Sequence, residues 1–161
     1  MKALPPHLRT RIAGTIELAR RGDRAGPVVE CADGMLCHDP ARQIDRRALA
    51  TRVLRASILG MSDPELLKYA ANTERLLQHD PLDVCTTVRG PEALVFTGEH
   101  DIFTYPAACR EVGAAFERGW FTTIHRADHL FHLQQWNAVI TLLLRFASRT
   151  LVGRSAEGWG E

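Results

Sequence analysis

Apolar residues recur three or four positions apart in the first half of the chain, which is the spacing of amphipathic helices. The first such segment begins after Pro6 and ends near Gly22, so proline and glycine mark its boundaries. Its apolar side carries Leu8, Ile12, Ile16 and Ala19. From Asp23 to Pro40, glycines and prolines surround the short run Val28–Val29, and we interpret this segment as a loop with a brief helical or extended piece.

Two more helices are predicted over residues 46–59 and 64–78. Asp45 is the expected N-cap of the first. At the second, Ser62 and Glu65 have the spacing of a capping box, in which the serine hydroxyl bonds the Glu65 amide and the glutamate side chain reaches back. The side chains expected to be buried are Leu49, Val53, Leu54 and Ile58 in the first helix and Leu66, Leu67, Ala70, Leu76 and Leu77 in the second.

The pattern changes after a predicted loop at residues 80–91, because residues 93–97 form a short apolar run without polar alternation. Such a run is typical of a strand that is buried on both faces of a parallel sheet. A helix is predicted from Pro106 to Phe116, a second strand over residues 120–124, and a long helix from Leu133 to Ala147. This order predicts a crossover unit with two parallel central strands.

The length of 161 residues is enough for one domain with a core, and the charge balance restricts its partners. Lys and Arg total 20 against 19 acidic residues, so no long-range field attracts nucleic acid or an anionic membrane surface. No apolar run approaches the roughly 20 residues that cross a bilayer, and the first residues lack the apolar core of a signal peptide. We therefore expect a cytoplasmic protein. The four cysteines lack CxxC spacing, so neither a disulfide framework nor a zinc site is expected.

Two polar motifs stand just beyond the ends of the predicted strands, where open α/β sheets place their functional groups. The motif at residues 98–101 contains Asp101, and the motif at residues 127–130 contains His129. A carboxylate that holds one nitrogen of an imidazole fixes its tautomer and stabilises its protonated form, as in two thirds of an acyl-transfer triad. A helix cap and a satisfied surface histidine also explain these residues, so both interpretations stay open on geometry alone.

The segment Leu94–Asp101, the proline-led helix after it and the segment Ile124–His129 follow the order strand, G-x-x-D, helix, strand, small residue and histidine. This order resembles the C-terminal end of an α/β-hydrolase over the stretch from Pro91 to Ala147. The resemblance implies that Asp101 is the triad acid and His129 the general base. No cofactor is expected.

The same resemblance suggests a domain organisation. In that family, lid helices are commonly inserted before the strand that carries the acid. The chain then divides into a helical lid-like region at residues 1–85, an α/β-hydrolase segment at 86–150 and a flexible tail at 151–161. The implied fold class is α/β, with a short parallel β-α-β unit and flanking helices. Four lid residues are expected to face an apolar groove above the histidine: Leu54, Ile58, Leu66 and Leu67.

The family's nucleophile stands on a G-x-S-x-G elbow, and the sequence contains no such elbow. Ser62 lacks the second glycine and is better explained as a helix cap, while Ser155 lies in the tail after the histidine. His125 and His132 share no helical face with His129, so no metal ion is expected, and no glycine-rich phosphate loop is present. A thiol can replace the hydroxyl, but no elbow surrounds any of the cysteines, Cys31, Cys37, Cys85 and Cys109.

A two-stranded parallel sheet leaves the outer edges of both strands unpaired, and isolated two-stranded sheets are marginally stable. Three arrangements would cover these strand edges: a second chain with the N-terminal half of the fold, self-association, or a longer gene product. One functional hypothesis is a hydrolase or acyl transferase for a small acyl or ester substrate, active only when the nucleophile-bearing half is present. The other is a non-catalytic remnant or binding module of the same fold.

Overall fold

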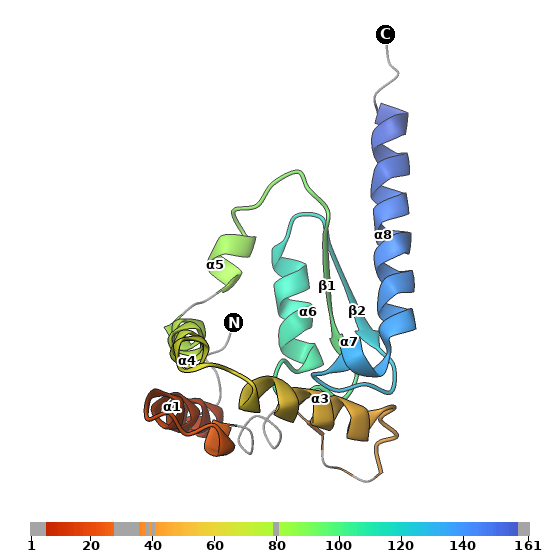
Figure 1. Cartoon of the computed structure of the whole chain (residues 1–161). Coiled ribbons are helices and arrows are strands. Elements are labelled where there is room, and N and C mark those ends of the chain that lie inside the picture. Colours follow the sequence, from red (N-terminus) through yellow and green to blue (C-terminus); the bar gives the residue numbers. More distant parts are fainter. Residues whose placement is uncertain (1–5, 28–35, 38, 40, 79–80, 158–161) are drawn as a thin grey trace.

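The computed structural model describes residues 6–27, 36–37, 39, 41–78 and 81–157 (Figure 1). A helical layer from the N-terminal half lies beside a small α/β unit from the C-terminal half. The helices of the first half are α1 (Pro6–Arg20), α3 (Arg47–Leu59), α4 (Asp63–Gln78) and α5 (Pro81–Cys85). The second half contains β1 (Ala93–Gly98), α6 (Pro106–Ala115), β2 (Gly119–Ile124), α7 (Phe131–Gln134) and α8 (Trp136–Glu157).

Strands β1 and β2 pair in parallel, with Ala93 opposite Gly119 and Gly98 opposite Ile124. Helix α6 connects the strands and covers one face of the sheet, while the start of α8 packs on the other face through Val139 against Ile124 (Figure 1). The predicted strand–helix–strand unit is therefore confirmed.

The sheet is less buried than the apolar run predicted. Residues 93–96 are half-buried, and Trp120 at the start of β2 is 41% exposed. Within the described part of the chain, neither strand pairs with a third strand. The expectation of a strand buried on both faces is thus wrong for residues 93–96 of β1, and only the last two residues of the strand are buried.

Helices α1 and α4 form the core of the helical layer, and each buries residues of its predicted apolar side. The two helices run side by side and bury one apolar stripe each. The buried side chains of this cluster are Ile12, Ile16, Ala19, Leu66 and Ala70. The side chains of Leu76 and Leu77, which were predicted in the same core, lie outside the described residues.

Three side chains that were predicted to be buried are exposed, namely Leu49, Val53 and Leu67, the last by 52%. In α3 the buried residues are Ala50 and Ile58, with the half-buried Leu54 between them. These three residues are four positions apart, so a single narrow stripe of α3 contacts the rest of the protein. The broad apolar side of the helix did not reveal which stripe is covered.

The starts of α3 and α4 also differ from the predicted caps. Arg46, not Asp45, occupies the N-cap position of α3, with a left-handed backbone (φ 51°, ψ 25°) and no side-chain cap bond. At α4, the Glu65 carboxylate accepts the N–H of Ser62 at 2.7 Å and its hydroxyl at 2.6 Å. The glutamate does reach back as predicted, but the serine hydroxyl bonds the carboxylate instead of the Glu65 amide.

Two segments have more helical structure than predicted. The expected loop at residues 80–91 contains α5, because Pro81 suits the first turn of a helix as well as it suits a loop. The expected helix from 133 to 147 is two helices, α7 and α8, and α8 continues to Glu157, into the segment predicted as a tail. The run Val28–Val29 lies outside the described residues. Of the helices described, none combines the length and apolarity needed to cross a bilayer.

Candidate active site

The acid loop begins where β1 ends. Beyond Gly98 the chain turns so that the Oδ1 atom of Asp101 accepts the N–H groups of Phe103 and Thr104, each at 2.8 Å. Aspartate side chains commonly bond the backbone two residues on in this way. These two bonds fix the direction of the buried Asp101 carboxylate.

The histidine loop follows β2 and is held by a buried carboxylate–amide pair. The Oδ1 atom of Asp128 accepts the N–H of Leu130 at 3.0 Å and the Nε2 group of Gln134 at 2.8 Å, and Gln134 Oε1 accepts the N–H of Asp128 at 2.9 Å. The second oxygen, Oδ2, accepts the N–H of Cys37 at 3.2 Å. Asp128 thus fixes the loop on both sides of His129. This role of Asp128 cannot be seen in the sequence, because it depends on a contact across 91 residues.

The acid loop and the histidine loop touch through their backbones at Gly98. A Cβ atom on Gly98 would lie 2.2 Å from the carbonyl oxygen of Asp128 and 2.6 Å from that of Ala127. Only glycine allows such an approach. The N–H of His100 donates to the Ala127 carbonyl at 2.9 Å, so the two loops stay paired beyond the strands.

Asp101 and His129, the two residues predicted as acid and base, lie at the same end of the adjacent strands. The distance from Asp101 Oδ2 to His129 Nδ1 is 2.9 Å. The carboxylate is fully buried, and the imidazole is 23% exposed with the Phe103 ring edge-on against it, 5.0 Å between centroids. Within the described residues His129 hydrogen bonds only through Nδ1. Its Nε2 atom is left for a further partner.

The environment of Asp101 favours its ionised form. Burial raises the pKa of Asp101, but the hydrogen bond and charge of His129 and the hydroxyls of Thr104 and Thr97 outweigh burial and lower the pKa to about 2. The carboxylate therefore carries its negative charge at neutral pH. A charged acceptor of this kind holds the imidazole in one tautomer.

Replacement of Asp101 by asparagine is expected to lower the free energy of unfolding by about 2 kcal/mol at neutral pH. The pKa of Asp101 lies below its ordinary value of 3.8. Its contribution is therefore complete above pH 4 or so and is lost as pH falls towards 2. Urea unfolding of the wild type and Asp101→Asn across this range measures the difference. The control Glu111→Gln removes an exposed carboxylate from α6. A stability difference that does not change with pH would contradict the assignment of the effect to the Asp101 charge.

No described side chain is placed as a nucleophile beside His129. Cys109 is half-buried, and burial followed by the charge of Asp101 raises the pKa of its thiol, which disfavours the thiolate. The Ser62 hydroxyl is bonded to Glu65 at the start of α4. Of the other thiols, Cys37 and Cys85 are buried and Cys31 lies outside the described residues.

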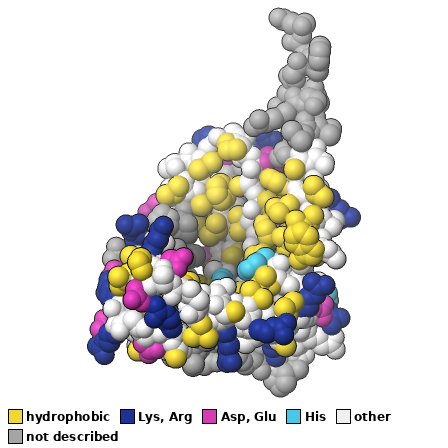
Figure 2. Space-filling view, in the orientation of Figure 1, with side chains coloured by type: hydrophobic (Ala, Val, Ile, Leu, Met, Phe, Trp, Pro, Cys, Tyr) yellow, Lys and Arg dark blue, Asp and Glu magenta, His cyan; other side chains and the backbone are white. Residues whose placement is uncertain are grey.

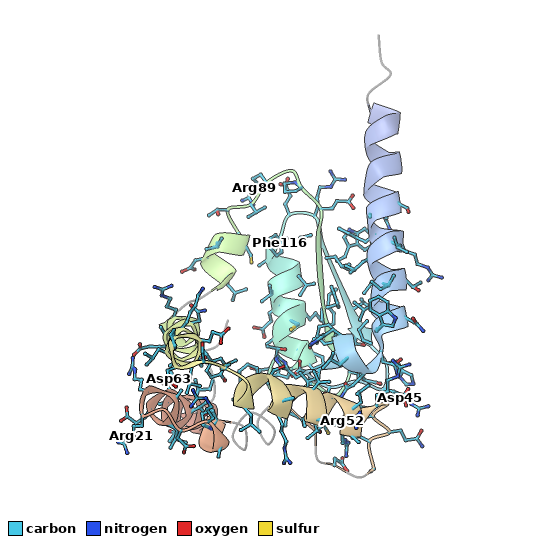
Figure 3. The ribbon with its side chains drawn as sticks, viewed as in Figure 1. Arg21, Asp45, Arg52, Asp63, Arg89 and Phe116 are labelled. Carbon is cyan, nitrogen blue, oxygen red and sulfur yellow. The ribbon has the colours of Figure 1, made fainter. Side chains whose placement is uncertain are left out.

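A second ionic group ties the helical layer to the histidine loop. Asp45 lies just before α3 (Figure 3), and its carboxylate accepts Arg126 Nη2 and Gln135 Nε2, each at 2.6 Å. Arg126 has a left-handed backbone (φ 55°), and its N–H donates to Glu99, which also bonds His125 Nδ1 at 2.7 Å. His125 is thus paired with Glu99 on the surface and does not join His129.

The predicted groove above the histidine is not formed as expected. Leu66 is buried between α1 and α4, and Leu67 is exposed. Leu54 of α3 belongs to a cluster with Leu130 and Leu133, and it also packs beside Ile58. A second contact to the helical layer comes from Phe103 of the acid loop, which packs against the α1–α4 cluster and contacts the His129 ring.

A parallel β-α-β unit with a buried carboxylate and a histidine in contact at its strand ends, followed by a long helix, is the C-terminal part of the α/β-hydrolase fold. Solved structures with this fold match the chain. A thermophilic esterase from Thermogutta terrifontis, solved with malate bound, matches with a TM-score of 0.72 and 19% identity, over 91% of this chain and 52% of that chain.

Two proteins of Mycobacterium tuberculosis match less closely. BpoC of strain H37Rv, named as a non-heme bromoperoxidase, has a TM-score of 0.58 and 23% identity, over 90% of this chain and 54% of that chain. Rv0554 has a TM-score of 0.51 and 23% identity, over 81% and 52%. The chain therefore spans about half the length of the structures that it matches. No protein-family model and no curated protein matches the sequence.

Proposed function

We propose that this chain supplies the acid, Asp101, and the general base, His129, of an ester or acyl hydrolase. The observation that carries the proposal is the 2.9 Å hydrogen bond between these side chains at the carboxyl ends of two parallel strands. The fold shared with the Thermogutta terrifontis esterase supports a small acyl or ester substrate.

The chemistry follows from the tautomer that Asp101 selects. With the Nδ1 proton donated to Asp101, the Nε2 atom of His129 carries the lone pair that accepts the proton of an attacking hydroxyl. As that hydroxyl adds to the carbonyl carbon, the imidazole becomes positively charged, and the ionised carboxylate stabilises it. The same proton then passes from Nε2 to the leaving oxygen, and the acyl group is released from the nucleophile by water in a second round.

In this proposal the attacking hydroxyl comes from a polypeptide segment outside these 161 residues, in a longer gene product or in a second chain, and that segment carries the remaining strands and a G-x-S-x-G elbow. Three observations support such a polypeptide: the sequence has no elbow, the chain spans about half of the matched structures, and β1 has no strand on its outer edge within the described residues. An unpaired edge offers backbone donors and acceptors to an incoming strand. The oxyanion amides would come from the same polypeptide.

Exposed apolar side chains mark the surface where we expect this polypeptide to pack. Helix α8 exposes Ile140, Leu143 and Leu144, the last by 63%, and β2 exposes Trp120. Figure 2 shows hydrophobic side chains gathered over the sheet and the lower part of α8. Exposed apolar side chains that gather in this way are typical of a protein interface.

The helical layer is proposed to act as a lid over the substrate. Its helices α1, α3 and α4 lie at the end of the sheet where the Asp101–His129 pair stands (Figure 1). It is attached to the histidine loop by the Asp45–Arg126 ion pair and to the acid loop by the packing of Phe103. Because the helical layer is attached to both loops, it would enclose the acyl group of a bound substrate. It would take no part in the chemical step.

The chain alone is expected to hydrolyse chromogenic esters such as p-nitrophenyl acetate at rates near the uncatalysed background. Its sequence has no G-x-S-x-G elbow, and the described residues place no nucleophile beside the base. The oxyanion hole, which accounts with substrate binding for the residual catalysis of damaged serine hydrolases, is built partly on that elbow. The assay compares the wild type with His129→Ala, and the two rates should be equal. Robust turnover that disappears in His129→Ala would place the nucleophile within this chain, and Ser62→Ala would be the next variant.

A further inference from the structure

The Asp101 carboxylate accepts more hydrogen bonds than the two that form the turn of the acid loop. Its Oδ1 atom accepts the two N–H groups of Phe103 and Thr104. Its Oδ2 atom, which faces His129, also accepts the hydroxyl of Thr97 at 2.7 Å and that of Thr104 at 2.6 Å. Five donors therefore meet on one buried carboxylate, and three of them meet on the oxygen that holds the imidazole.

Thr97 differs from the other donors because it belongs to the strand. It is the last residue but one of β1 and is 1% exposed. Its hydroxyl lies within reach of three acceptors, Asp101 Oδ2 at 2.7 Å, the carbonyl oxygen of Thr104 at 3.1 Å and the hydroxyl oxygen of Thr104 at 3.4 Å. A carboxylate is the stronger acceptor, and hydrogen bonds to it are shorter. The single hydroxyl proton of Thr97 therefore goes to Asp101.

We infer that Thr97 is a positioning residue for the Asp101–His129 pair, whose hydroxyl directs Asp101 Oδ2 at the imidazole and keeps the buried carboxylate ionised. The inference rests on the proposed function of that pair. Thr97 is anchored in the sheet and Thr104 in the loop, so rotation of the carboxylate breaks both hydroxyl bonds together. An ionised group without such donors is costly to bury.

The pKa of Asp101 separates this role from a merely structural one. Burial raises that pKa, and the bonds from His129, Thr104 and Thr97 lower it. A threonine that only satisfied its own hydroxyl would leave the pKa of Asp101 unchanged when replaced. A threonine that stabilises the carboxylate must raise the pKa on removal, because the charged form loses a donor.

The test is a ¹³C NMR titration of the Asp101 carboxyl group in the full chain. Thr97→Val keeps the shape of the side chain and removes the hydroxyl, and it is expected to raise the pKa of Asp101 by about one pH unit, the equivalent of one hydrogen bond to a charged group. Thr97→Ser restores the hydroxyl and should return the pKa to the wild-type value. If Thr97→Val does not fold, Thr97→Ala removes the hydroxyl without adding an atom, and the same rise is required.

Thr123→Val is the matched control, because Thr123 is the partner of Thr97 across the ladder and has no bond to Asp101. It should leave the pKa of Asp101 unchanged. A folded Thr97→Val or Thr97→Ala protein with the wild-type pKa would overturn the inference. This readout needs no turnover, so a failure of the proposed hydrolase activity and a failure of the Thr97 role are seen in separate experiments.

Discussion

Alanine in place of Gly98 is expected to separate the acid loop from the histidine loop and to cost about 3 kcal/mol or more of folding free energy. The added Cβ would stand 2.2 Å from the carbonyl oxygen of Asp128 and 2.6 Å from that of Ala127. Both obstacles are backbone atoms, and Asp128 is itself held by Leu130 and Gln134. The end of β1 therefore cannot move away from the added Cβ contact without disrupting the hydrogen bonds of the loop that carries His129.

The measurement is urea unfolding of Gly98→Ala beside the control Gly14→Ala. Gly14 lies in α1, and a Cβ there meets nothing within 4 Å. The control should therefore gain about 0.5–1 kcal/mol from the better helix propensity of alanine. If Gly98→Ala were as stable as the wild type and kept the NMR signals of the Asp101–His129 hydrogen bond, the close contact of the two loops would be refuted.

The sequence was sufficient to predict what depends on local pattern. The apolar runs gave the two strands, their spacing gave the helix between them, and parallel pairing then brought Asp101 and His129 to one edge of the sheet. These inferences need only the period of the hydrophobic residues and the rule that parallel strands share an edge. The periodicity also gave the apolar sides of α1 and α4, but not the packing of one helix on the other.

The features that were not predicted depend on contacts between distant residues. Asp45 looked like a helix cap, but its carboxylate serves Arg126 and Gln135, 81 and 90 residues away. Asp128 reaches Cys37 over a similar separation. The local sequence does not show whether a carboxylate accepts a hydrogen bond from a nearby backbone N–H or from a donor that is distant in the sequence. Thr97 was passed over for a related reason, since in the sequence it is only the last polar residue of an apolar strand.

Loss of the His129 imidazole is expected to have the largest effect on activity. In the completed hydrolase, the complex of this chain with a polypeptide that carries the elbow, His129→Ala should reduce kcat by a factor on the order of 10⁴ to 10⁶, the range found when triad members are removed. Asp101→Asn should cost on the order of 10⁴, because it leaves the imidazole in place with the wrong tautomer. His125→Ala is the matched control, since His125 is 79% exposed and bonded to Glu99.

The central claim is that this chain holds the base of a hydrolase whose nucleophile lies outside these 161 residues, in a longer gene product or in a second chain. The most direct measurement is p-nitrophenyl ester turnover by the chain fused to, or co-expressed with, a polypeptide that carries the remaining strands and a G-x-S-x-G elbow. We predict turnover by the complex, none by either part, loss in His129→Ala and retention in His125→Ala. Equal turnover by the wild-type and His129→Ala complexes, or an elbow-bearing polypeptide that is fully active without this chain, would contradict the account.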